Sequence, residues 1–137
     1  MAHRVFIVDD EINIRRLVEV NLTKEGYIVE QAVDGVDALE KIKANPPDLI
    51  ILDVMMPRKD GFETLKDLMS NPQTANIPVI MLTAKAQDKD IFKGWQSGVS
   101  AYLTKPFNPR ELIVFTERIL TNINHPEYEN MEAIYEI

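Results

Sequence analysis

The residues best suited to chemistry are acidic and fall in two places along the sequence. Asp9, Asp10 and Glu11 follow one apolar run, and Asp53 follows another. Carboxylates brought close together repel, and the pKa of at least one of them rises unless a positive charge compensates. A hard divalent cation or an ammonium group can do so, and oxygen ligands without His or Cys favour Mg²⁺ or Mn²⁺ over Zn²⁺. These acids therefore predict a Mg²⁺ site, with Mn²⁺ as the alternative ion.

Two further polar residues stand at corresponding places later in the chain. Thr83 follows a third apolar run, and Lys105 follows a weaker strand-like segment. In open α/β sheets, ligands bind outside the carboxyl ends of the strands, where the strand order reverses. A solvated turn or a helix cap explains the Asp9–Asp10 pair equally well when that pair is taken alone. Four strand ends that converge on one crevice favour a binding site.

The elements that would position these residues alternate strand with helix five times. Three runs are apolar at every position, as in parallel strands covered by helices on both faces, at 5–8, 49–52 and 79–82. Weaker strands are predicted at 28–33 and 101–104. Helical spacing of apolar residues predicts helices at about 14–22, 36–42, 62–69, 87–97 and 108–121. The pattern predicts a doubly wound α/β domain with a five-stranded parallel sheet.

Composition narrows the class of protein. The chain has 137 residues, of which 45% are hydrophobic, enough for one domain with a real core. It has no cysteine, which excludes disulfides and thiolate metal sites. A net charge of −7 repels phosphate backbones, so we expect protein partners rather than nucleic acid. The sequence contains no signal-peptide core and no run long enough to span a membrane, and we expect a cytoplasmic protein without membrane contact.

Four segments resemble the signature of the response-regulator receiver domain. They read Asp-Asp-Glu after the first strand, Leu-Asp-Val-Met-Met-Pro-Arg-Lys-Asp-Gly after the third, Met-Leu-Thr-Ala-Lys after the fourth and Tyr-Leu-Thr-Lys-Pro-Phe at the fifth. The match runs roughly from Arg4 to Leu120 and implies a flavodoxin-like fold with strand order 2-1-3-4-5. We expect a receiver domain at residues 1–122. For the acidic tail at 123–137, a short amphipathic helix and a frayed end remain open.

The resemblance implies a role for each acid. Asp53 would accept a phosphoryl group from a phosphohistidine on a histidine kinase or a His-phosphotransfer protein. Asp10, Asp53 and the backbone carbonyl of Met55 would ligate Mg²⁺ directly, whereas Asp9 would act through a water molecule. Lys105 would pair with the phosphoryl group, and its peptide bond to the following proline would be cis.

The resemblance also implies a conformational switch. Thr83 would donate its hydroxyl to a phosphoryl oxygen, and Tyr102 would rotate inward into the space that Thr83 leaves. A half-buried strand aromatic without a switching role is the alternative for Tyr102. The downstream target would dock on the face of the fourth helix, fifth strand and fifth helix, near Phe115, unless Phe115 belongs to the core.

The expected function is that of a stand-alone receiver that signals by protein contact in a two-component pathway or phosphorelay. It would not be an enzyme beyond self-catalysed phosphoryl transfer to Asp53 and slow autodephosphorylation. The alternative is the receiver part of a longer regulator with a DNA-binding or enzymatic output. An aspartyl-phosphate hydrolase is disfavoured because Met55 stands where its second acid would be. A flavin carrier is disfavoured because Asp9 and Asp10 would repel the cofactor phosphate.

Overall fold

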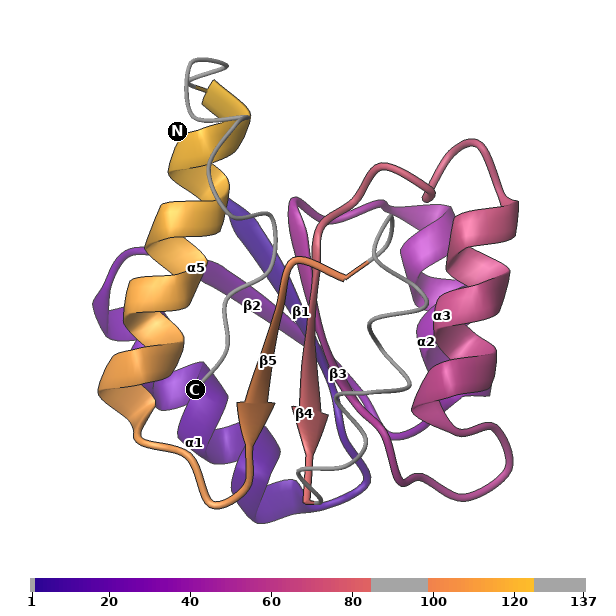
Figure 1. Cartoon of the computed structure of the whole chain (residues 1–137), viewed down its shortest axis with the longest axis horizontal. Helices are drawn as coiled ribbons and strands as arrows, with labels where there is room; N and C mark the ends of the chain where they lie inside the picture. Colours follow the sequence, from indigo (N-terminus) through magenta and orange to yellow (C-terminus); the bar gives the residue numbers. More distant parts are fainter. Residues whose placement is uncertain (1, 85–98, 125–137) are drawn as a thin grey trace.

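Five short strands form one parallel sheet at the centre of the molecule (Figure 1). The computed structural model describes residues 2–84 and 99–124. The strands lie in the order β2-β1-β3-β4-β5, and each neighbouring pair is parallel. They span Arg4–Val8 (β1), Ile28–Ala32 (β2), Leu49–Asp53 (β3), Val79–Thr83 (β4) and Ala101–Thr104 (β5). Both the predicted sheet and the predicted strand order are confirmed.

Helices cover both faces of the sheet, which explains why the central strands are apolar throughout. They span Ile12–Lys24 (α1), Gly35–Ala44 (α2), Gly61–Ser70 (α3) and Pro109–Asn124 (α5). Figure 1 shows α1 and α5 on one face and α2 and α3 on the other. Alternate residues of β3 enter the two cores: Leu49 and Ile51 pack with the α1/α5 side, and Ile50 and Leu52 with the α2/α3 side. Every residue of β3 and β4 is buried, as expected of strands covered on both faces.

The predicted elements agree with the observed ones to within a few residues. The largest difference within the described chain is α5, which continues to Asn124, three residues beyond the predicted end. The predicted helix at 87–97 and the tail from residue 125 onward lie outside the described residues. None of the helices within residues 2–84 and 99–124 is long and apolar enough to cross a membrane.

The strand order reverses direction between β1 and β3, at one edge of the sheet. From β1 the chain passes outward to β2 on one side and then returns to β3 on the other. The segments that follow β1 and β3 consequently lead to helices on opposite faces, α1 and α3 (Figure 1). The carboxyl ends of β1 and β3 lie side by side between them, which is the usual place for a ligand in such a sheet.

Helix α3 begins in direct contact with the backbone of the residue that ends β3. Its first residue is Gly61, whose N–H donates to the carbonyl of Val54 at 2.8 Å. A Cβ atom on Gly61 would lie 2.2 Å from the carbonyl oxygen of Asp53 and 2.8 Å from the Cα of Val54. Only glycine fits there without displacing the end of β3. Asp60 and Glu63 cap the same turn reciprocally, which fixes where α3 starts.

We expect Gly61→Ala to lower the free energy of unfolding by about 1–3 kcal/mol, because the added methyl group overpacks a rigid backbone contact. Lys66→Ala, on the exposed side of the same helix, is the matched control and should change it by less than about 0.5 kcal/mol. Urea unfolding followed by circular dichroism measures both. Equal stability of the two variants would show that the contact at Gly61 can relax freely.

Candidate functional site

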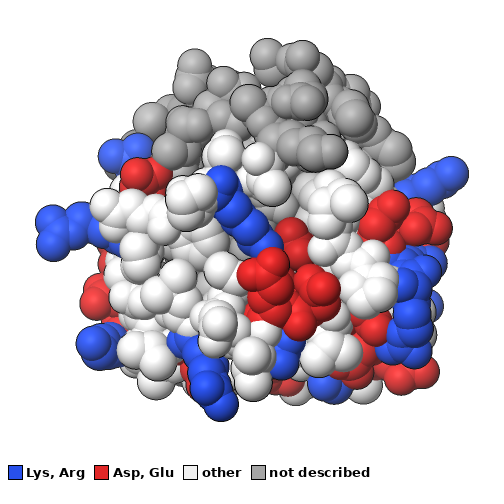
Figure 2. All heavy atoms as spheres, turned by 90° about the horizontal axis from the view of Figure 1, so that it is seen from below, with Lys and Arg blue, Asp and Glu red and all other residues white. Residues whose placement is uncertain are grey.

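Three aspartates meet at the carboxyl edge of the sheet. Asp9 directly follows β1, Asp10 is the next residue, and Asp53 is the last residue of β3. One carboxylate oxygen of each lies within 4.8 Å of the others. Asp9 and Asp53 are buried, with exposed fractions of 0% and 4%, whereas Asp10 is exposed. Seen from this edge, acidic side chains gather near the centre of the face with a basic side chain beside them (Figure 2).

Lys105 brings one positive charge to this cluster. It follows β5, and its Nζ atom lies 2.8 Å from Asp9 Oδ2 and 3.2 Å from Asp53 Oδ1. Its backbone N–H donates to the carbonyl of Thr83 at 2.7 Å, which ties the segment after β5 to the end of β4. The Lys105–Pro106 peptide bond is cis, as the resemblance to receiver domains implied. The structure therefore brings together the four charged side chains that the sequence placed at strand ends.

The carboxylate of Asp9 is held in a fixed orientation. Its Oδ1 atom accepts from the backbone N–H of Glu11 at 2.9 Å, and its Oδ2 atom accepts from Lys105. The backbone of Asp9 is anchored as well, because its carbonyl accepts from Arg15 Nη1 at 2.8 Å and its N–H donates to the carbonyl of Ala32 at 3.2 Å. Asp9 has little freedom to turn away from Asp53.

The charges in this cluster are out of balance. Burial and the charges of Asp9 and Asp10 raise the pKa of Asp53, Lys105 lowers it, and the net pKa is about 7. Burial disfavours the charged form of Lys105, but its hydrogen bond to Asp9 and the charges of Asp53 and Asp9 outweigh burial and raise its pKa. Within residues 2–84 and 99–124, three carboxylates thus share one ammonium group.

The donor set fits a hard divalent cation. All three side chains offer carboxylate oxygens, the ligands that Mg²⁺ prefers, and the exposed Asp10 leaves the site open to solvent. Met55, two residues beyond Asp53, is 65% exposed in the loop that leads to α3. The excess negative charge and the oxygen-only donors together make this an acidic site that could hold a metal ion.

The two predicted switch residues lie on neighbouring strands beside the site. Thr83 is buried at the end of β4, one residue beyond Leu82, the partner of Asp53 in the sheet. Tyr102 on β5 is 0% exposed, which is deeper than the half-buried position considered from the sequence. Phe115 on α5 is only partly buried and packs against the core on the α1/α5 side.

Sequence reasoning missed an ion pair next to the cluster. Asp34, 4% exposed at the start of α2, accepts from Arg58 Nε at 2.6 Å, and Arg58 lies in the loop after β3 with a φ of 63°. An isolated Asp before a glycine and an Arg in a polar loop carry no periodic signal. Only the tertiary fold brings them together.

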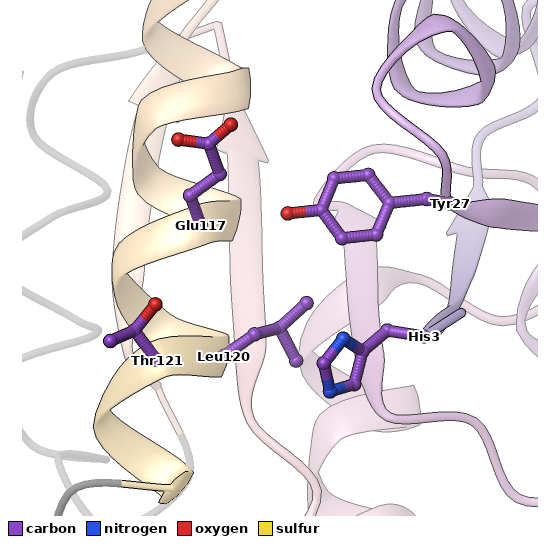
Figure 3. A pocket seen from close by; sticks show the side chains of 5 residues that line it. All are labelled: His3, Tyr27, Glu117, Leu120 and Thr121. Atoms are coloured by element: carbon purple, nitrogen blue, oxygen red, sulfur yellow. The ribbon is translucent and has the colours of Figure 1, made fainter. Parts of the chain in front are cut away.

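A separate hollow lies at the opposite edge of the sheet, between α5 and the amino ends of β1 and β2 (Figure 3). Its volume is about 230 Å³, and its lining includes His3, Tyr27 and Glu117. Burial raises the pKa of Tyr27, and the charges of Glu117 and Glu25 add to the effect. Because His3 and Tyr27 precede their strands, this hollow is not part of the aspartate cluster.

Comparison with known proteins identifies the family. A family model described as the response regulator receiver domain matches residues 5–117. Among solved structures, the chemotaxis protein CheY4 of Vibrio cholerae is 38% identical with a TM-score of 0.80, over 87% of this chain and 99% of that one. NtrX from Brucella abortus is 30% identical with a TM-score of 0.81, over 96% of this chain and 30% of its own.

Two transcriptional regulators are also similar in sequence. The DNA-binding dual master transcriptional regulator RpaA of Synechocystis sp. is 44% identical over 117 residues, which make up 85% of this chain and 48% of that protein. The alkaline phosphatase synthesis transcriptional regulatory protein PhoP of Bacillus subtilis is 43% identical over 120 residues, 88% of this chain and 49% of that protein. The chain spans about half the length of both.

The raised pKa of Asp53 predicts a distinctive pH dependence of stability without divalent cations. Folded Asp53 has a pKa of about 7, against about 3.9 for an unfolded aspartate. Between these values the folded state binds more protons, so the contribution of Asp53 to the free energy of unfolding falls as pH rises, by on the order of a few kcal/mol. Urea unfolding in chelator from pH 4 to pH 8 should show Asp53→Asn gaining stability relative to wild type as pH rises. A parallel pH dependence in both proteins would contradict the raised pKa.

Proposed function

The chain belongs to the response regulator receiver domain family, and from that premise we propose that it is a phosphorylation switch whose phosphoacceptor is Asp53. One observation carries the proposal: the nearly buried carboxylate of Asp53 lies between two further aspartates and the ammonium group of Lys105. A carboxylate in that setting has a nucleophilic oxygen next to groups that can neutralise an incoming phosphoryl group.

The proposed step is a transfer between two nucleophiles. An oxygen of ionised Asp53 attacks the phosphorus of a phosphohistidine on a histidine kinase or a His-phosphotransfer protein. The P–O bond of an acyl phosphate forms while the P–N bond breaks, and its electron pair stays on the imidazole nitrogen, which then takes up a proton. Lys105, 3.2 Å from Asp53 Oδ1, would pair with the negative charge on the phosphoryl oxygens. Ionised Asp53 needs no general base.

Asp10, Asp53 and the backbone carbonyl of Met55 would hold Mg²⁺, or Mn²⁺, and Asp9 would reach it through water. When bound, the cation supplies positive charge that neutralises the carboxylates and the phosphoryl oxygens. Asp9 itself keeps Lys105 in place through their 2.8 Å hydrogen bond. Because metal-free Asp53 has a pKa of about 7, Lys105 alone leaves a large protonated fraction at neutral pH.

Phosphorylation would be read out through β4 and β5. A phosphoryl group adds negative charge and three acceptor oxygens, and Thr83 at the end of β4 is the nearest hydroxyl along the sheet register. A shift of Thr83 would change the packing around Tyr102 on the next strand. The signal would then leave the molecule on the face of β5 and α5, where Phe115 is partly exposed; the predicted fourth helix of this face lies outside the described residues.

The proposed setting is a cytoplasmic two-component pathway or phosphorelay. The domain is a signalling module, and self-catalysed transfer with slow autodephosphorylation is the only chemistry assigned to it. RpaA is a DNA-binding regulator by name and about twice as long as the matched segment. That likeness favours a DNA-binding output for a longer regulator, whereas the full-length match to CheY4 supports a receiver that acts by protein contact.

We expect wild-type protein to gain one phosphoryl group when it is incubated with acetyl phosphate or phosphoramidate and Mg²⁺, and Asp53→Asn to gain none. The amide retains the shape of the side chain but lacks the nucleophilic oxygen. Intact mass spectrometry measures the gain, and Asp67→Asn on α3 is the control that removes a carboxylate elsewhere. An Asp53→Asn variant that is still phosphorylated would move the phosphoacceptor to another residue.

A further inference from the structure

The loop of residues 54–60 joins β3 to α3 and carries Met55, whose carbonyl is a Mg²⁺ ligand in the proposed function. The loop is held firmly where it starts. The N–H of Val54 donates to the carbonyl of Leu82 at 3.0 Å, and the carbonyl of Val54 accepts from Gly61 at 2.8 Å. Met55 itself is 65% exposed. The direction of its carbonyl therefore depends on the contacts that hold the rest of the loop.

Arg58, whose side chain is 60% exposed, contacts Asp34 from this loop. Its Nε and Nη2 atoms lie 2.6 Å and 2.5 Å from Asp34 Oδ2. The other oxygen of Asp34 accepts from the backbone N–H of Asp37 at 2.9 Å, which caps α2. A carboxylate that is only 4% exposed is costly to leave without its charged partner. Arg58 has a φ of 63°, a region that residues other than glycine and asparagine seldom adopt. The loop thus takes up an uncommon backbone conformation at the residue that reaches Asp34.

The ion pair spans the carboxyl end of β1. Asp34 follows β2 and Arg58 follows β3, and β1 lies between these two strands. The segment after β2 starts beside Asp9, because the carbonyl of Ala32 accepts from the N–H of Asp9 at 3.2 Å. Helices α2 and α3, which these two segments enter, lie on the same face of the sheet (Figure 1). The pair therefore ties together the two loops that flank the aspartate cluster on that face.

We propose that Asp34 and Arg58 are positioning residues that fix the Met55 carbonyl for Mg²⁺ binding without touching the cation. This inference rests on the proposed function. Only Met56 and Pro57 separate Met55 from Arg58, and Pro57 has a fixed φ, so this stretch has few free dihedrals. Met56 packs against the α2/α3 core, and the second anchor of the segment is its far end, where the Arg58–Asp34 ion pair lies beside a 3.3 Å hydrogen bond from Gly35 N–H to the carbonyl of Lys59.

A purely electrostatic role for Arg58 makes the opposite prediction. Arg58 is a cation near a cation site, so removing its charge should strengthen Mg²⁺ binding through Coulomb's law alone. Removing an anchor of the loop should weaken Mg²⁺ binding, because the carbonyl is no longer held in place. The direction of the change in affinity distinguishes the two roles.

The test is a Mg²⁺ titration of the whole chain followed by amide NMR shifts. Arg58→Asn keeps a residue that tolerates positive φ and should raise the Mg²⁺ Kd by about tenfold, the usual effect of losing a group that orients a metal ligand. Lys66→Gln removes a positive charge from the exposed side of α3, outside the loop, and should leave the Kd unchanged or slightly lower. Arg58→Lys, which can still reach Asp34, should recover part of the affinity.

Asp34→Asn retains an oxygen that can cap α2 and should weaken binding as much as Arg58→Asn does. The double variant should be no weaker than either single variant. Thermal unfolding in chelator verifies that each variant is folded. Arg58→Asn protein that binds Mg²⁺ as tightly as wild type, or more tightly, overturns the inference. Wild-type protein without Mg²⁺-dependent shifts, or Asp10→Asn protein that binds like wild type, overturns the proposed function and this inference with it.

Discussion

Adjacent parallel strands end at the same edge of a sheet, and here Asp9 directly follows β1 and Asp53 is the last residue of β3. The backbone hydrogen bonds that join them leave Asp9 and Asp53 no way to separate, and Asp10 adds a third charge within 4.8 Å. Such crowding is stable only if positive charge is brought to it or if one carboxyl group stays protonated. Lys105 supplies one positive charge. The pKa of Asp53 remains at about 7, because this single positive charge does not fully compensate burial and the neighbouring carboxylates.

Much of the surrounding structure serves to hold this repulsive cluster together. The β3 and β4 strands are buried along their whole length, so their ends cannot move apart without opening both cores. The hydrogen bond from the Lys105 backbone N–H to the carbonyl of Thr83 fixes the backbone of Lys105 at the end of β4, and so positions its ammonium group beside the aspartates. Gly61 lets α3 approach the backbone of Asp53, and Asp34 and Arg58 join the loops on the same side. Burial is unfavourable for an isolated carboxylate, but here it helps to form an acidic site that could hold a cation.

The sheet and the four charged residues at strand ends could be predicted from local signals in the sequence, whereas the strand order followed only from the resemblance to receiver domains. Continuous apolar runs such as 49–52 mark buried parallel strands, and an acid or lysine directly after such a run must lie at the carboxyl edge. The contact between Asp34 and Arg58 had no such signal, because it depends on the separation of two loops and on a backbone conformation that arginine seldom adopts. The depth of Tyr102 was also missed, since strand periodicity indicates a face of the sheet but not how closely the covering helices pack.

The ionisation of Asp53 is the most direct test of this account. With selectively ¹³C-labelled aspartate, the chemical shift of the Asp53 carboxyl carbon can be followed by NMR as a function of pH, first in chelator and then with saturating Mg²⁺. The account predicts a midpoint of about 7 in chelator, and a decrease of about one to three pH units when the cation supplies the missing charge. A midpoint near the ordinary aspartate value of about 3.9 in chelator, unchanged by Mg²⁺, would contradict it.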